Sequence, residues 1–163
     1  MKKHYLLVSI AWFIFLLAWT LPVHKHGVAL PEGLPGCEAL GISLAPLWDH
    51  LVGRPRDISF AHRFLSTLSG GTNLLMIGSG YAVFASSRRV LNTHFLISVA
   101  AALINGYWFL FWGFELRIGY FMWWLSFLVL AVGIHALLTA EGDELEQHQS
   151  LVSQQELARR FTY

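Results

Sequence analysis

Five side chains in the first part of the chain have the right chemistry to bind a metal ion. His24 and His26 form a His-x-His pair, and the other three follow at scattered positions, Cys37, His50 and His62. Imidazole and thiolate groups are common ligands of zinc and copper. Their spacing matches no standard metal-binding framework. We therefore favour scattered surface histidines and keep a metal site as the alternative.

A second pair of histidines lies in apolar sequence. His94 and His135 fall near the same expected end of two neighbouring helices. Two facing imidazoles could hold a haem or relay protons. A single histidine on each helix is more often an interfacial or hydrogen-bonded residue, so we expect no cofactor and keep haem binding as the alternative.

Three uncharged polar residues interrupt long apolar stretches at similar depths. Asn73, Asn105 and Ser126 are each expected roughly 12–14 Å below the outer end of a helix. An amide in hydrocarbon is costly without a partner. We predict that the three form a polar layer with a structural use. The alternative is a substrate pathway in a small transporter or channel component.

The sequence contains no motif typical of an enzyme. It has no Ser–His–Asp order, no H-E-x-x-H and no phosphate-binding loop, and Gly78-x-Gly80 lies inside an apolar stretch. The formal net charge is +1, which provides no field to attract nucleic acid. We therefore predict a non-enzymatic protein that binds no nucleic acid.

The elements that must position these residues are four apolar stretches. Each approaches the roughly 20 residues that a helix needs to cross a bilayer, and only 13% of the chain is charged. The sequence predicts an all-α integral membrane protein, a four-helix transmembrane bundle in the lipid bilayer. Its helices are expected at about 5–21, 64–85, 95–113 and 118–139.

Small residues recur four apart along the second predicted helix. They are Ser66, Gly70, Gly78 and Ala82. Stripes of this kind let helix backbones approach closely in a membrane. We predict that this stripe packs against another helix of the same chain, and self-association into an oligomer is the alternative.

The distribution of basic residues predicts the orientation of the chain. Lys2 and Lys3 precede the first helix, and Arg88 and Arg89 lie in the short link that is expected between the second and third helices. Positive charge collects on the cytoplasmic side of membrane proteins. We predict a multi-pass protein of a bacterial plasma (inner) membrane, with both termini cytoplasmic. The first helix lacks a small-x-small cleavage site, so we expect it to be retained rather than removed as a signal peptide.

Two segments lie outside the four predicted helices. The first, 22–63, is expected to be an extracytoplasmic loop with an amphipathic helix over 37–52, too short to span. The second, 141–163, is a polar cytoplasmic tail that follows the transmembrane domain 1–140. Long loops are often functional. We therefore predict a membrane subunit or accessory protein that binds a protein partner through the outer loop or the tail, with a transporter component and a haem- or metal-binding redox subunit as alternatives.

Overall fold

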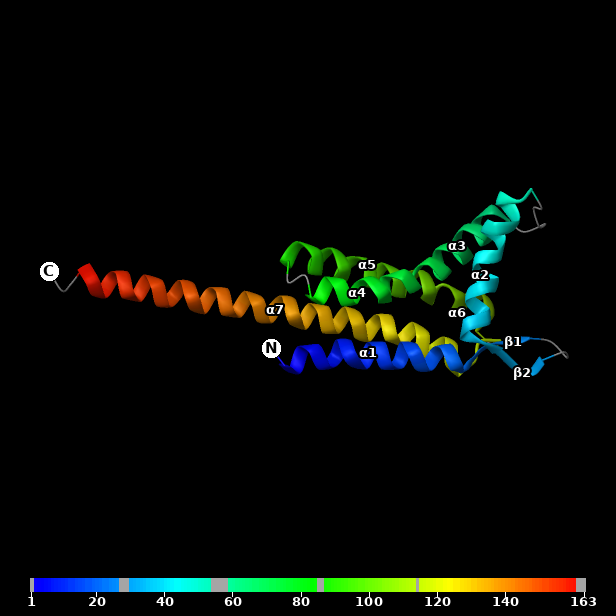
Figure 1. Cartoon of the computed structure of the whole chain (residues 1–163), viewed down its shortest axis with the longest axis horizontal. Coiled ribbons are helices and arrows are strands. Elements are labelled where there is room, and N and C mark those ends of the chain that lie inside the picture. The colour runs from blue at the N-terminus through cyan, green and yellow to red at the C-terminus, as the bar shows by residue number, and fades with distance from the viewer. Residues whose placement is uncertain (1, 27–29, 54–58, 85–86, 114, 161–163) are drawn as a thin grey trace.

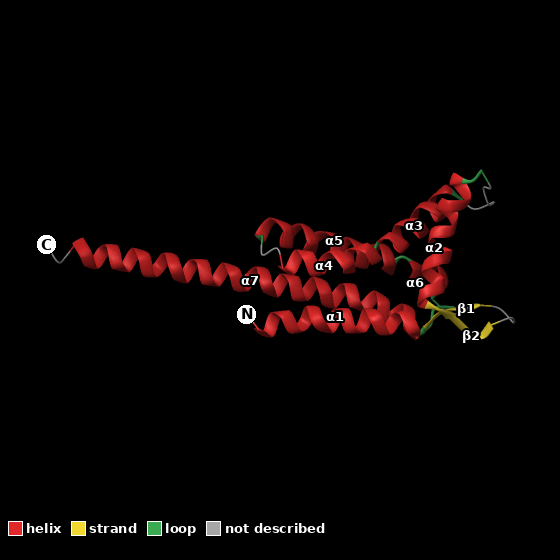
Figure 2. Ribbon diagram, in the orientation of Figure 1, coloured by secondary structure: helices red, strands yellow, loops and turns green. Residues whose placement is uncertain are grey.

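The computed structural model describes residues 2–26, 30–53, 59–84, 87–113 and 115–160, and this part of the chain is helical apart from a two-stranded hairpin (Figures 1 and 2). In chain order the elements are α1 (Lys2–Thr20), β1 (Pro22–His26), β2 (Leu30–Pro35), α2 (Gly36–Leu51), α3 (Phe60–Gly71), α4 (Asn73–Phe84), α5 (Arg88–Gly106), α6 (Trp108–Trp112) and α7 (Ile118–Arg160).

Two helical segments of the described chain are long and apolar enough to cross a membrane. They are Arg88–Leu110 and Ile118–Ala140, with mean hydropathies of 1.4 and 2.0. The apolar part of α1, Tyr5–Thr20, is shorter, and the predicted span over 64–85 is divided between α3 and α4. The all-helical architecture agrees with the sequence prediction, and two candidate spans stand where four were predicted.

The division between α3 and α4 falls at Thr72. The Thr72 hydroxyl donates a hydrogen bond of 2.6 Å to the Ser69 carbonyl, and the Asn73 side-chain amide donates one of 2.7 Å to the Gly70 carbonyl. Carbonyls at the end of a helix lack partners within that helix, and here polar side chains supply them. The chain changes direction at this point (Figure 1), so the second predicted helix is two helices.

A second division separates α5 from α6 at Tyr107. Two side chains of α7 donate hydrogen bonds to carbonyls in the last turns of α5. The Tyr120 hydroxyl reaches Asn105 at 2.6 Å, and the Trp124 indole reaches Ala102 at 2.8 Å. At its other end α5 begins at Arg88, seven residues before the predicted start. The expected link over 86–94 is therefore largely helical from Arg88 onward, and Leu91 in it is buried.

The last helix, α7, is a single element of 43 residues. It passes the predicted boundary at 140 without interruption and extends well beyond the other helices (Figure 1). The sequence after Thr139 is rich in Glu and Gln, contains no proline and has a single glycine, Gly142. Strong helix formers of this kind allow a helix to continue after its apolar part ends. We call residues 141–160 the α7 extension.

The helix α7 runs antiparallel to both α1 and α5, and both ends of the chain lie at the same end of the bundle (Figure 1). Extensive contacts join α1 to α7, α7 to α5 and α5 to α4. Where α1 meets α7, Ala11 is fully buried, and a Cβ at Gly133 would lie 3.1 Å from Leu7 and Val8. Phe127, Leu130 and Ile134 of α7 are fully buried in the same core.

The opposite end of the bundle is crossed by α2, beside the β1–β2 hairpin (Figure 1). The predicted amphipathic helix over 37–52 corresponds to α2. Close backbone contacts hold this end together. A Cβ at Gly36 would lie 2.7 Å from the Ala18 carbonyl oxygen, and the Arg117 backbone amide donates to the Val23 carbonyl at 3.0 Å. The hairpin was not predicted, because its prolines and glycines indicated turns only.

Candidate functional site

Asn105 is the centre of a buried hydrogen-bond network between α3, α5 and α7. Its side chain accepts a hydrogen bond of 2.6 Å from the Ser69 hydroxyl and donates one of 3.2 Å to the Thr72 hydroxyl. Its carbonyl accepts from the Tyr120 hydroxyl. Asn105 is fully buried, and an unpaired amide there would be costly. These bonds join three helices at one level.

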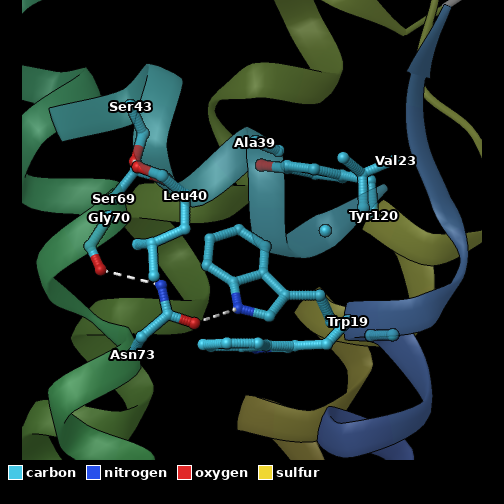
Figure 3. Close-up of a pocket in the computed structure, with 12 residues that line it drawn as sticks. Trp19, Val23, Ala39, Leu40, Ser43, Ser69, Gly70, Asn73 and Tyr120 are labelled. Carbon is cyan, nitrogen blue, oxygen red and sulfur yellow. Dashed lines mark hydrogen bonds between the residues drawn. The ribbon is translucent and has the colours of Figure 1, made fainter. Parts of the chain in front are cut away.

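Asn73 belongs to the same level and links α4 to α7. Its side-chain oxygen accepts a hydrogen bond of 3.0 Å from the Trp123 indole, while its amide donates to the Gly70 carbonyl. The carboxamide therefore caps α3 and bridges to α7 at the same time. Figure 3 shows both bonds beside a cavity that Asn73 lines.

Ser126, the third residue of the predicted polar layer, is fully buried and donates to the Trp123 carbonyl of its own helix at 2.6 Å. None of the hydrogen bonds between described residues joins Asn73, Asn105 and Ser126 to one another directly. Asn73 and Asn105 instead bond to Trp123, Ser69 and Thr72. Sequence depth alone did not identify these partners, because they lie on other segments of the chain: Trp123 is 50 residues from Asn73, and Ser69 and Thr72 are 36 and 33 residues from Asn105.

An apolar cleft of about 370 Å³ lies between α1 and α4, beneath α2. Its lining includes Trp12 and Phe15 of α1, Leu44 of α2, and Leu74 and Ile77 of α4. The Trp12 indole donates a hydrogen bond of 3.0 Å to the Ser79 hydroxyl across this side of the bundle. Two helices that face one another therefore enclose a space, with a tryptophan reaching from one to the other.

A smaller chamber of about 100 Å³ adjoins the cleft (Figure 3). Four residues line both spaces, Trp19, Leu40, Gly70 and Asn73. The chamber also contains polar groups from four elements. They belong to Ser43, Ser69, Asn73 and Tyr120. The combined site is thus apolar along most of its length and has polar groups at one end, and it was not predicted from the sequence.

The two histidines of the predicted haem pair, His94 and His135, have different neighbours. The His94 ring makes a hydrogen bond of 3.0 Å with the Leu75 carbonyl of α4. The His135 ring packs at 5.5 Å from the ring of Phe95 and is exposed. The bond to Leu75 engages the nitrogen of His94 that a haem iron would need. The haem hypothesis remains a prediction that these contacts do not favour.

The metal hypothesis falls largely outside the described side chains. The structure describes no side chain at His24, His26, His50 or His62, and Cys37 is exposed at the start of α2. Among the side chains that are described, no three metal-ligating groups come together. The histidine-rich site therefore stays a prediction.

The predicted small-residue stripe faces two different helices. Ser66 donates a hydrogen bond to the Ser43 carbonyl, and Gly70 faces the Ser43 side chain, so this half packs on α2. A Cβ at Gly78 would lie 3.1 Å from the His94 ring, so the other half packs on α5, and Ala82 is fully buried. The division at Thr72 explains why one stripe serves two interfaces.

Comparisons of this chain with protein-family models, curated proteins and solved structures found no match.

Proposed function

We propose that this chain is a multi-pass, non-enzymatic protein of a bacterial plasma membrane that acts by binding a second protein. Four antiparallel helices would cross the bilayer, with both termini cytoplasmic and α2 lying across the outer end. The apolar part of α1, Tyr5–Thr20, is about 24 Å long, which is shorter than the roughly 30 Å hydrocarbon core, and a bilayer can thin locally to match a short span. The break at Thr72 is compatible with a spanning segment because side chains satisfy the freed carbonyls.

The observation that carries the partner-binding role is the α7 extension. A helix of about 30 Å continues past the bundle, and its apolar side chains Leu151 and Val152 are 57% and 43% exposed. Helices of this length are marginally stable in water without packing. A polar helix that leaves the membrane with adjacent exposed apolar residues would gain stability by docking against another protein.

Site-specific photocrosslinking in native membranes tests this proposal. A photoreactive amino acid in place of Leu151 should give a discrete protein adduct, whereas the same group in place of Leu103, which is exposed on α5, should not. Val152→Asp should abolish the adduct through the cost of burying a carboxylate, and Ser153→Asp, at an exposed polar position, should preserve it. Equal adducts from positions 151 and 103, or no adduct, would reject the proposal.

A further inference from the structure

From the cleft between α1 and α4 we infer that this protein has a binding site for a neutral, single-chain lipid whose head group carries a hydroxyl. Long-chain alcohols and monoacylglycerols belong to this class. The inference rests on the membrane location in the proposed function, but it is independent of partner binding by the α7 extension.

The volume and the apolar lining of the cleft suit the hydrocarbon chain of a lipid. Its volume of about 370 Å³ is within the range of roughly 300–1,000 Å³ that is typical of small-molecule sites. The described lining is almost wholly apolar, and it continues into the chamber at Trp19, Leu40 and Gly70. Leu16, Leu74 and Ile77 line the cleft and are also exposed on the surface of the bundle. A lipid can therefore reach the cleft sideways from the bilayer.

The described lining is uncharged, which favours a ligand with a neutral head group. None of the described residues that line the cleft or the chamber is charged. A carboxylate or phosphate that entered this space would lose its hydration without gaining a counter-charge, which is strongly unfavourable. Fatty acids and phospholipids are therefore poor candidates.

The hydrogen bonds that the residues of the chamber already make favour a ligand with a hydroxyl group. The hydroxyl groups of Ser43, Ser69 and Tyr120 already donate to Leu40, Asn105 and Asn105 respectively. A hydroxyl has one hydrogen but two lone pairs, so all three can still accept. A ligand that donates a hydrogen bond complements them, and a ligand with only carbonyl acceptors does not. The second amide hydrogen of Asn73 can in turn donate to the ligand oxygen.

The chamber measures about 100 Å³ and shares four lining residues with the cleft, so it suits a compact head group at the end of a chain. A quinone head offers only carbonyl acceptors, so it lacks the donor that the hydroxyls of the chamber can accept. Figure 3 shows the chamber bounded by Leu40 and Ser43 of α2 at one side and Trp19 and Asn73 at the other.

Direct binding of radiolabelled 1-monooleoylglycerol to the full chain in phosphatidylcholine nanodiscs tests the inference. We expect saturable binding that unlabelled monooleoylglycerol displaces. Oleate, methyl oleate and a short-chain ubiquinone should each displace at least tenfold less effectively. Equal displacement by methyl oleate or by the quinone would overturn the assignment of the head group.

Paired variants locate the site. Ile77→Trp should fill the mouth of the cleft and weaken binding at least tenfold. Leu103→Trp is the matched control, because Leu103 is similarly exposed on α5 and lines neither space. Both positions are exposed, so neither variant should prevent folding, which size-exclusion chromatography would check. Ser43→Ala should reduce the preference for monooleoylglycerol over methyl oleate. Equal binding by the two tryptophan variants would place the ligand elsewhere and overturn the inference.

Discussion

The two sides of α1 differ in how they meet the rest of the bundle. On the side toward α7, small residues bring the backbones together, with Ala11 buried and Gly133 against Val8. On the side toward α4, Trp12 reaches Ser79 and a cleft of about 370 Å³ remains. We call these the closed side and the open side. A bulky aromatic side chain such as Trp12 thus leaves a cavity between α1 and α4, whereas small residues allow close packing of α1 against α7.

This difference shows where stability and function can be separated. Van der Waals contact drives helix association in a membrane, so a close seam of small residues contributes most of the packing. The open side lacks such contacts along the cleft, and a hydrogen bond from Trp12 to Ser79 joins its two helices. We therefore expect large effects on stability from the closed side and small ones from the open side.

The largest loss of unfolding free energy should come from a substitution at Gly119, at the end of the closed side. A Cβ there would lie 2.7 Å from the Leu21 carbonyl oxygen and 2.8 Å from that of Pro22. These backbone atoms of one neighbouring segment cannot move easily, so Gly119→Ala should cost about 3 kcal/mol of unfolding free energy. Gly80→Ala is the control, because no atom lies within 4 Å of a Cβ there. It should be neutral or stabilising by about 0.5–1 kcal/mol. Denaturation in mixed detergent micelles would measure both, and equal losses would contradict the closed side as described.

The buried network should give the next largest effect. Asn105→Leu removes the side chain that pairs with Ser69 and Thr72 and leaves their buried hydroxyls with fewer partners. We expect a loss of about 2 kcal/mol. The same change at Asn92, which is exposed in the same helix, should stay within about 0.5 kcal/mol. Equal losses of unfolding free energy from the two substitutions would show that the buried network makes no specific contribution to stability.

A smaller effect is expected on the open side. In a double-mutant cycle with Trp12→Phe and Ser79→Ala, the coupling free energy should be about 0.6 kcal/mol, typical of hydrogen bonds between membrane helices. Each variant also changes other contacts, so only the coupling term reports the bond. A coupling of several kcal/mol would mean that the open side is held as firmly as the closed side.

The smallest effect should follow removal of the α7 extension. Figure 1 shows this segment beyond the ends of the other helices. A stop codon after Ala140 should therefore change the unfolding free energy of the bundle by less than about 0.5 kcal/mol. A larger loss would show that the extension packs on the bundle.

The sequence was sufficient to predict the helical architecture and the short helix over 37–52. Both follow from composition and helical periodicity. The polar layer of Asn73, Asn105 and Ser126 stays a prediction, although all three side chains are buried. The order of helices around the bundle was not accessible. It depends on which small residues meet, and nothing in the spacing of Ala11 or Gly133 shows that they face one another.

Helix boundaries were predicted least well, for a specific physical reason. The breaks at Thr72 and Tyr107 both occur where side chains take over carbonyls that the helix would otherwise use. Thr72 and Asn73 act locally, so the sequence contained a signal for the first break. Tyr120 acts from a different helix, so the second break required tertiary structure. The cleft was also inaccessible, because it depends on the distance between α1 and α4.

The membrane topology is the claim on which the proposed function depends, and Cys37 allows it to be measured directly. It is the only cysteine in the chain and is exposed at the start of α2. A membrane-impermeant maleimide should label Cys37 in intact spheroplasts. A variant with Cys37→Ser and Gln154→Cys, at an exposed position of the α7 extension, should be labelled only after lysis. The reverse pattern, or labelling of both positions before lysis, would contradict a bundle with its α2 end outside and its α7 extension in the cytoplasm.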